Sequence, residues 1–260
     1  MRKIAYFLFL FSWAYAEIQL VPVDPTPQPD CAFVRIQTPH DEKIVTAKNL
    51  WTSIRMRGYP LGYISDFLRK NELPNSKLGQ SIHIIVDDKP YFAYSGPSAD
   101  PFIEQGDYFQ EIYRIAVRFP LEDGMHTLRV FPARSYGEGL KTLECFDAIT
   151  FYINEKKIDW AKSLRRPFLT YNEPSHHLTY VEGRPVLVDF YASNCELSKD
   201  GYKVRMTIDE THQRLLPELR PYFIYGLGKG NHTIRLELVD AKSEPVPGGY
   251  NDITRSFSVR

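Results

Sequence analysis

Two histidines occupy equivalent places in two similar segments and are the first candidates for catalysis or metal binding. His126 lies in the sequence Gly-Met-His-Thr-Leu-Arg-Val at 124–130, and His232 lies in Gly-Asn-His-Thr-Ile-Arg-Leu at 230–236. Each histidine follows a turn glycine and shares one face of its segment with apolar residues. This pattern favours a packed, hydrogen-bonded histidine at the edge of a core.

The adjacent histidines His176 and His177 could bind copper or zinc together with His40, which lies near the equivalent edge of the first segment. Neighbouring residues on a strand point to opposite faces, so both rings reach one ion only if the stretch is a loop. We therefore predict no metal ligands. A periplasmic metal-binding protein is the weaker alternative function.

Paired carboxylates could supply general acid–base catalysis, as in Asp87-Asp88 and Asp209-Glu210. Both pairs end an apolar segment just before a polar turn, so we expect them to be exposed. The chain has no nucleophile elbow, zinc-protease motif, phosphate loop or dinucleotide fingerprint. The sequence predicts no catalytic residues, no cofactor and no enzyme, with an unrecognised glycoside hydrolase left open as an alternative.

Aromatic residues gather where the first segment is longest. The stretch between Asp88 and Gly124 is longer than its counterpart before Gly230, and it is rich in Gly, Pro, Ser and Asp. Aromatic side chains on an irregular loop suit recognition of sugars or protein surfaces. The rings could equally cover an open edge of a sheet or pair two copies of the chain. The predicted ligand-binding residues are Tyr91, Phe92, Tyr94, Phe102, Tyr108 and Phe109.

The first 16 residues have the pattern of a secretory signal peptide. A basic start at Arg2 and Lys3 precedes an apolar run over 4–13, and small residues stand before a cut after Ala16. The run is about half the roughly 20 residues that span a bilayer. We expect the mature protein to be secreted or periplasmic, with no membrane insertion after cleavage.

Charge and composition exclude several classes of partner. The chain of 260 residues carries 32 Lys and Arg against 32 Asp and Glu, and it has no basic tract. Nucleic acids and anionic membrane surfaces attract proteins chiefly through positive charge, so neither is expected as a partner. Hydrophobic residues make up 43% of the chain and aromatic residues 14%, which excludes intrinsic disorder.

The positions that could do chemistry belong to two copies of one module. The aligned segments at 124–130 and 230–236 continue without a gap, and each repeat opens with a proline, at Thr38-Pro39 and at Glu173-Pro174. We predict five parts: a signal peptide at 1–16, a Pro-rich extended tether at 17–30, a first module at 31–154, a linker at 155–166 and a second module at 167–260.

Apolar and polar residues alternate over short segments in both copies, which predicts strands with one buried face. The sequence predicts one short helix at 64–70, opened by Ser65 and Asp66, inside a long insertion at 57–80. The repeated pattern resembles tandem bacterial immunoglobulin-like and fibronectin type III-like modules. The resemblance implies an all-β fold of two tandem immunoglobulin-like antiparallel β-sandwiches, the first with long loop insertions and the short helix.

This resemblance also places two cysteines near each other. Cys31 precedes the first strand of the first module and Cys145 precedes its last strand, and these strands can run side by side in an immunoglobulin-like sandwich. We therefore predict a Cys31–Cys145 disulfide, with Cys195 unpaired. Three free thiols and a dimer linked through Cys195 are the alternatives.

These expectations together favour a non-enzymatic protein that acts in binding, adhesion or envelope interaction. Its partner would be a protein or a glycan that the sequence does not identify, and it would act as a monomer or as an edge-paired oligomer. The alternative is a carbohydrate-active protein, either a sugar-binding accessory or the hydrolase considered above. Fold and compartment follow from the sequence more directly than the ligand does.

Overall fold

The computed structural model describes the backbone of residues 17–46, 49–97, 100–105 and 108–260, and their side chains except at 100–105 and 108–110. The predicted signal peptide, residues 1–16, lies outside the described residues. No helix in the described part of the chain is long and apolar enough to cross a membrane. The helical elements are the short 3-10 helices η1 (Leu68–Asn71), η2 (Leu143–Cys145) and η3 (Trp160–Lys162).

The first sandwich consists of a four-stranded and a five-stranded sheet, with strand orders β2-β4-β8-β7 and β3-β10-β9-β5-β6. The strands of the first sheet are β2 (Phe33–Thr38), β4 (Trp51–Arg57), β7 (Asp100–Gln105) and β8 (Tyr108–Ala116). Those of the second are β3 (Lys43–Val45), β5 (Ser81–Val86), β6 (Phe92–Tyr94), β9 (Gly124–Ala133) and β10 (Asp147–Ile153).

The second sandwich consists of two four-stranded sheets, with strand orders β1-β15-β12-β11 and β14-β13-β16-β17. The strands of the first of these sheets are β1 (Gln19–Pro22), β11 (Phe168–Glu173), β12 (Val186–Ser193) and β15 (Tyr222–Tyr225). Those of the second are β13 (Lys203–Ile208), β14 (His212–Leu216), β16 (Gly230–Val239) and β17 (Asp252–Val259).

The two sandwiches repeat one strand order, in which β2-β4-β8 corresponds to β11-β12-β15 and β6-β5-β9-β10 corresponds to β14-β13-β16-β17. The registers agree as well, because His126 pairs with Phe151 on β10 and His232 pairs with Phe257 on β17. This is the strand order of an immunoglobulin sandwich, with antiparallel sheets apart from the parallel β3–β10 pair. The predicted fold class is confirmed.

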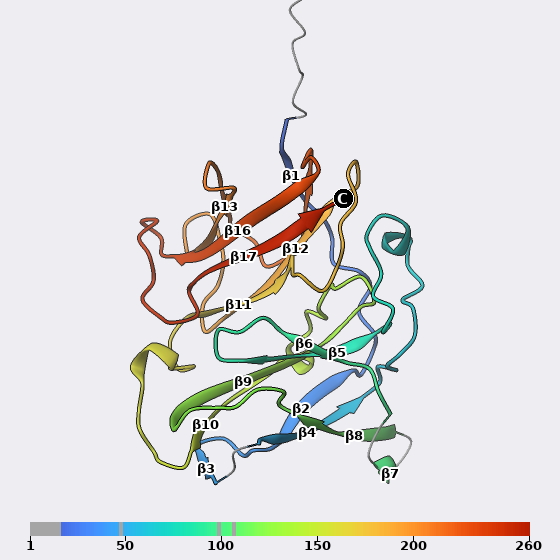
Figure 1. The fold of residues 1–260 in the computed structure, drawn as a ribbon, viewed down its shortest axis with the longest axis vertical. Helices are drawn as coiled ribbons and strands as arrows, with labels where there is room; N and C mark the ends of the chain where they lie inside the picture. Colours follow the sequence, from blue (N-terminus) through green and yellow to red (C-terminus); the bar gives the residue numbers. More distant parts are fainter. Residues whose placement is uncertain (1–16, 47–48, 98–99, 106–107) are drawn as a thin grey trace, which may run out of the picture.

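The four sheets stack in one direction (Figure 1), so that the β3-β10-β9-β5-β6 sheet of the first sandwich lies against the β1-β15-β12-β11 sheet of the second. Both faces of β5 and β9 are buried, as are both faces of β11. A sheet that is buried on both faces lies inside the molecule. The junction between the sandwiches is therefore an interior layer of the protein.

The N-terminal segment 17–30 is a packed part of the structure, and its prediction as a free tether was wrong. Strand β1 pairs antiparallel with β15, from Gln19 opposite Tyr225 to Pro22 opposite Tyr222. It occupies the sheet edge that β7 occupies in the first sandwich. The second copy is shorter at this point, and β1 supplies the strand that the copy lacks. Pro22 is tolerated because an edge strand leaves one side without ladder hydrogen bonds.

The insertion at 57–80 contains the 3-10 helix η1 instead of the predicted helix at 64–70. Ser65 does not cap a helix, because its amide donates to Ser135 Oγ at 3.0 Å and its hydroxyl donates to Gln80 Oε1 at 2.9 Å. Long-range bonds of this kind use the donor and acceptor that a helix start would need. Tertiary contacts thus override the local capping pattern.

The predicted disulfide between Cys31 and Cys145 is absent, since all three cysteines are free. Cys31 is exposed, whereas Cys145 is buried and its thiol donates to the carbonyl of Ala32 at 3.4 Å. In the second module Asn251 takes the place of Cys145, and its Nδ2 donates to the carbonyl of Pro167 at 3.0 Å. Both residues tie the last strand to the residue before the first strand, so Cys145 forms a backbone contact in place of a bond to Cys31.

Candidate functional site

Two apolar clusters join the sandwiches and set the distance between their facing sheets. One contains Ile85, Tyr91, Phe131 and Tyr191, and the other contains Leu73, Tyr136, Leu187 and Phe223. Both clusters combine residues of the first and second modules. Their burial stabilises the junction by roughly 25 cal/mol for each Å² of apolar surface removed from water.

Asn172 on β11 lies at the centre of a buried polar network in the same layer. Its Nδ2 donates to the carbonyl of Gly137 at 2.6 Å and to Asp189 Oδ2 at 2.7 Å. Its Oδ1 therefore faces the Nδ1 of His83 on β5, at 2.8 Å. Burial lowers the pKa of His83 to about 3. His83 is a neutral ring whose Nδ1–H donates to Asn172, which leaves Nε2 as an acceptor.

A buried carboxyl group, Glu173, lies one residue further along β11. Its Oε1 accepts hydrogen bonds from the hydroxyls of Tyr91 at 2.6 Å and Ser175 at 3.3 Å, and its Oε2 accepts from Tyr180 at 3.1 Å. Burial raises the pKa of Glu173 to about 7, against the opposing effect of these hydrogen bonds and of Arg255. Glu173 therefore holds Tyr91 of the first sandwich against the second sandwich.

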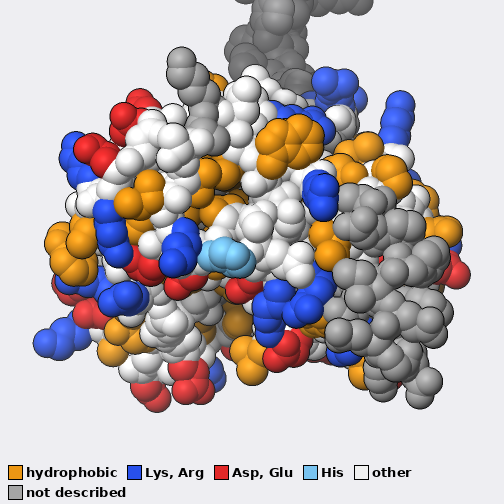
Figure 2. All heavy atoms as spheres, turned by 90° about the horizontal axis from the view of Figure 1, so that it is seen from below, with side chains coloured by type: hydrophobic (Ala, Val, Ile, Leu, Met, Phe, Trp, Pro, Cys, Tyr) orange, Lys and Arg blue, Asp and Glu red, His pale blue; other side chains and the backbone are white. Residues whose placement is uncertain are grey.

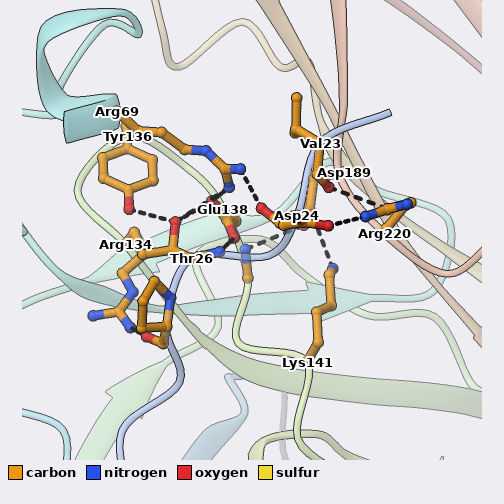
Figure 3. Close-up of polar contacts among 12 residues, drawn as sticks. Val23, Asp24, Thr26, Arg69, Arg134, Tyr136, Glu138, Lys141, Asp189 and Arg220 are labelled. Carbon is orange, nitrogen blue, oxygen red and sulfur yellow. Dashed lines mark hydrogen bonds and ion pairs between the residues drawn. The ribbon is translucent and has the colours of Figure 1, made fainter. Parts of the chain in front are cut away.

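A charged clasp holds the N-terminal segment against both sandwiches (Figure 3). The amide and the hydroxyl of Thr26 donate to the two carboxylate oxygens of Glu138, each at 2.7 Å. Arg69 also pairs with Glu138, and Arg220 of the second module pairs with Asp24. Thr26 is 4% exposed and Glu138 is 1% exposed, so the contact between these two residues lies in the interior of the protein. Buried charge requires such partners.

A pocket of about 530 Å³ opens at the edge of this junction. Strands β5 and β6, the insertion at 57–80 and the turn after β11 each contribute to it. Volumes of this size are typical of small-ligand sites. Its lining is Pro74, Asn75, Ser76, Lys77, Leu78, Ser81, His83, Tyr91, Phe92, Ala93, Arg118, Arg134, Ser135, Gly137, His177, Leu178 and Thr179.

Aromatic rings form a stack along one side of the pocket. The ring centroid of Tyr91 lies 3.7 Å from that of His83, with the two rings stacked in parallel. It lies 4.7 Å from the ring centroid of His177, which is tilted against it. His83 and Tyr91 are buried, whereas His177 is exposed and Phe92 is half-buried. His177 also contacts the carbonyl of Tyr91 through Nε2 at 2.6 Å. The stack therefore presents the ring of His177, held in place by this contact, and the neighbouring ring of Phe92 to a ligand.

The structure distributes the predicted ligand-binding aromatic residues unequally. Tyr91 and Phe92 line the pocket. Tyr94 instead packs beside the core of the first sandwich, with its hydroxyl donating to the carbonyl of Pro97 at 2.8 Å. Phe102, Tyr108 and Phe109 belong to β7 and β8, and their side chains lie outside the described residues. The irregular loop expected here is mostly a pair of strands, because the alternation at 108–116 suits a half-buried strand.

Other pocket residues were missed by sequence reasoning, notably His83, Arg134 and His177 as one group. They lie far apart in the chain and meet only because the two copies pack against each other. The adjacent histidines at 176 and 177 were considered only as metal ligands. Their rings lie 4.0 Å apart, and no group of three or more His, Cys, Asp or Glu in the described chain could hold a metal ion.

The repeated histidines are structural in both modules, as predicted. His126 contacts Asp87 Oδ2 through Nδ1 at 2.7 Å and the carbonyl of Glu122 through Nε2 at 2.8 Å. His232 has the same two contacts, with Asp209 at 2.7 Å and the carbonyl of Gly228 at 2.8 Å. Asp87 is only 8% exposed, so its prediction as an exposed turn residue was wrong. Asp87 directly follows β5, and His126 lies on the neighbouring strand β9, so the contact between them crosses from one strand to the next.

A second hollow lies on the outer side of the first sandwich, among Phe33, Arg35, Arg55, Arg57 and Glu144. Arg35 and Glu144 form an ion pair there. Figure 2 views the molecule from below, where the β2-β4-β8-β7 sheet lies, and shows basic and acidic side chains interspersed. This hollow is lined by the first module alone, whereas the junction pocket combines residues of both modules, so we take the junction pocket as the candidate site.

No family model matches the chain, and no curated protein matches it. Among solved structures, fibronectin(III)-like modules of Clostridium thermocellum CbhA match with 12% identity and a TM-score of 0.29, over 87% of this chain and 94% of that one. The two tandem V-type regions of VCBP3, a v-region-containing chitin binding protein, match with 9% identity and a TM-score of 0.24, over 88% and 99%.

The third solved structure is SGBP-B from the Bacteroides ovatus mixed-linkage glucan utilization locus, in complex with a mixed-linkage heptasaccharide. It matches with 11% identity and a TM-score of 0.19, over 94% of this chain and 47% of that one. None of these likenesses assigns a ligand to this chain.

Proposed function

We propose that this chain is a secreted or periplasmic, non-enzymatic binding protein that holds a saccharide in the pocket between its two sandwiches. The observation that carries the proposal is the ring stack of His83, Tyr91 and His177 beside Phe92, in a pocket whose remaining lining is mostly polar. A sugar ring presents apolar C–H groups on its faces and hydroxyls around its rim. Aromatic rings suit those faces at small entropic cost.

The polar lining suits the hydroxyl rim. Ser81 and Ser135 are buried and the Asn75 amide is already bonded to Lys70 and Ser135, so the hydroxyl groups that remain accessible in the lining are those of Ser76 and Thr179. These side chains can donate and accept hydrogen bonds, as sugar hydroxyls also do. They are mounted on elements from both modules, so the packing of the sandwiches fixes their spacing.

The same lining favours binding over hydrolysis. Glycoside hydrolysis generally uses two carboxyl groups about 5–10 Å apart on either side of the scissile bond. The described lining of the pocket contains no carboxyl group. Glu173 lies beneath Tyr91 with an exposure of 0%, where its oxygens are occupied by three hydroxyl groups. The pocket therefore supplies contacts to a ligand without a catalytic pair.

Glycan-array screening of the purified chain tests the proposal, with the double variant Phe92→Ala/His177→Ala as the probe of the site. We expect the chain to bind a subset of the saccharides on the array. The double variant should bind them at least about tenfold more weakly, which corresponds to a loss of roughly 1.4 kcal/mol of binding free energy. Trp51→Ala is the matched control, since Trp51 is an exposed aromatic residue of β4, outside the pocket lining. It should leave binding unchanged.

The melting temperature of each variant shows whether it is folded. A chain that retains no saccharide would contradict the proposed function. Equal retention by the chain and by a folded double variant would place any saccharide site elsewhere on the molecule, and would contradict it as well.

A further inference from the structure

The geometry points to an acidic saccharide, one that bears a carboxylate, as the ligand of the junction pocket. This inference rests on the proposed function and specifies its ligand. It is carried by the positive charges of the pocket, which have no carboxylate partners of their own.

Arg134 is the first of these charges. It lines the pocket from the loop after β9 and is 5% exposed. Its guanidinium lies 4.6 Å from the ring centroid of Phe67 and 5.5 Å from that of Tyr59. Nη2 donates to the carbonyl of Pro27, and Nε has no hydrogen-bond partner.

An ion-paired carboxylate is what a buried arginine usually requires, because desolvation of an unpaired charge costs several kcal/mol. Arg134 forms no ion pair with any described residue. Its surroundings are aromatic rings and a backbone carbonyl, which hold the planar guanidinium in place without neutralising it. A guanidinium held in this way is suited to bind a carboxylate with two parallel hydrogen bonds.

Lys77 and Arg118 add two exposed cations to the same lining. Neither forms an ion pair or a hydrogen bond with a described residue through its side chain. The pocket thus carries three positive charges, one of them held in place at Arg134, and no carboxyl group among its described lining residues. The whole chain is neutral, with 32 basic and 32 acidic side chains, so this local excess is a property of the pocket. A concave surface lined by one sign of charge concentrates ligands of the opposite sign.

Rings and cations together select the class of ligand. A small inorganic anion would use the cations but not Phe92 or the exposed ring of His177. A neutral sugar would use the rings but leave Arg134 unpaired. A uronate-bearing oligosaccharide uses both, since its ring face can stack on the aromatic groups while its carboxylate reaches the guanidinium.

Titration calorimetry on the full mature chain tests this inference with two matched sugars, digalacturonate and the neutral galactobiose of the same linkage. We expect digalacturonate to bind at least about tenfold more tightly, and we expect the difference to shrink as salt is raised. Arg118→Gln and Lys77→Gln should each weaken digalacturonate binding by roughly fivefold, and galactobiose binding by less, because galactobiose carries no charge. Lys229→Gln, an exposed lysine of the second module outside the pocket lining, is the control.

Because Arg134→Gln could disturb the contact with Pro27, Arg134→Lys is the informative variant at that position. It keeps the charge but loses the planar pair of donors, and it should weaken digalacturonate binding by about tenfold while the chain melts as before. Retention of full affinity in this variant and in Arg118→Gln would overturn the inference.

Three further results would also overturn the inference. Galactobiose could bind as tightly as digalacturonate, which would leave the proposed saccharide function intact. Digalacturonate could fail to bind while the array retains neutral sugars, with the same consequence. Sulfate alone could bind as tightly as digalacturonate, which would make the pocket a simple anion site. Failure of every saccharide on the array would instead contradict the proposed function itself.

Discussion

Glu173 shows at the scale of one residue how the junction is held together. The duplication aligns it with Thr38, which also precedes a proline, and nothing in that comparison marks it as buried. In the structure its carboxyl group is enclosed by hydroxyls of Tyr91, Ser175 and Tyr180. Burial raises its pKa from 4.5 to about 7 in the folded state. The folded protein therefore binds a proton more tightly at this site than the unfolded chain does.

The substitution Glu173→Gln tests this linkage. A carboxyl group with a raised folded pKa contributes stability that is complete below pH 4.5 and is lost as the pH rises through about 7. As the pH rises from 4.5 to about 7, the loss of this stabilising contribution should lower the free energy of unfolding of the natural chain by on the order of 3 kcal/mol. Because glutamine does not titrate, the free energy of unfolding of the variant relative to the natural chain should rise between pH 5 and pH 8.

Urea titrations of both proteins at the two pH values provide the measurement. Other titrating groups are shared by the two proteins, so most of their effects cancel in the difference. If the free energies of unfolding of the two proteins differ by the same amount at pH 5 and pH 8, Glu173 is ionised in the folded protein at both pH values, and its pKa is not raised.

Residue-level prediction from the sequence was strongest where the pattern is local. The repeated Gly-x-His-Thr segment correctly predicted packed histidines at 126 and 232. It did not predict that Asp87 would be buried beside His126, because the bond joins two strands that lie 39 residues apart in the chain. The pocket histidines were missed for the same reason, since His83 and His177 meet only across the junction.

Strand β1 is the element whose role could least be predicted from sequence. Period-two alternation identifies strands such as β9 and β16, which are long and pair with neighbours from the same module. β1 has four residues and is followed by a proline-rich stretch, so its local pattern favours an extended tether. Its partner β15 lies about 200 residues away, and only the missing edge strand of the second module explains the pairing.

Two adjacent substitutions in β1 test whether the strand completes the second sandwich. Leu20 packs against the core of that sandwich, whereas Val21 is 39% exposed on the opposite face. Leu20→Asp should lower the free energy of unfolding by about 2 kcal/mol, because it places a carboxylate against apolar side chains. Val21→Asp, the matched control, should change it by less than about 0.5 kcal/mol.

Denaturant unfolding followed by tyrosine and tryptophan fluorescence measures both effects. Equal stabilities of the two variants would indicate that β1 is only loosely attached. A larger loss of unfolding free energy for Val21→Asp than for Leu20→Asp would show that Val21, and not Leu20, faces the core of the second sandwich.

The whole molecule is one body built from two similar modules, and its candidate site belongs to neither module alone. The sequence predicts two β-sandwiches because each copy carries its own alternating strands, and the resemblance to immunoglobulin-like modules implies their topology. It does not predict how they pack, since polar residues such as Arg129 and Asn172 are fully buried only in the assembled layer. Arg129 donates to the carbonyl of Leu169 and to Thr170 Oγ1 of the other module, each at 3.1 Å. Such contacts become visible only when both copies are placed together.

We propose that a ligand binds where the two modules meet. Heteronuclear NMR of residues 17–260 titrated with digalacturonate tests this proposal most directly, because each backbone amide reports its own environment. We expect the largest shift changes in three separate stretches, 74–78, 91–93 and 177–179, which line the pocket from different elements of both modules. Shift changes confined to one module, or centred on the outer face of β2 and β4, would contradict it.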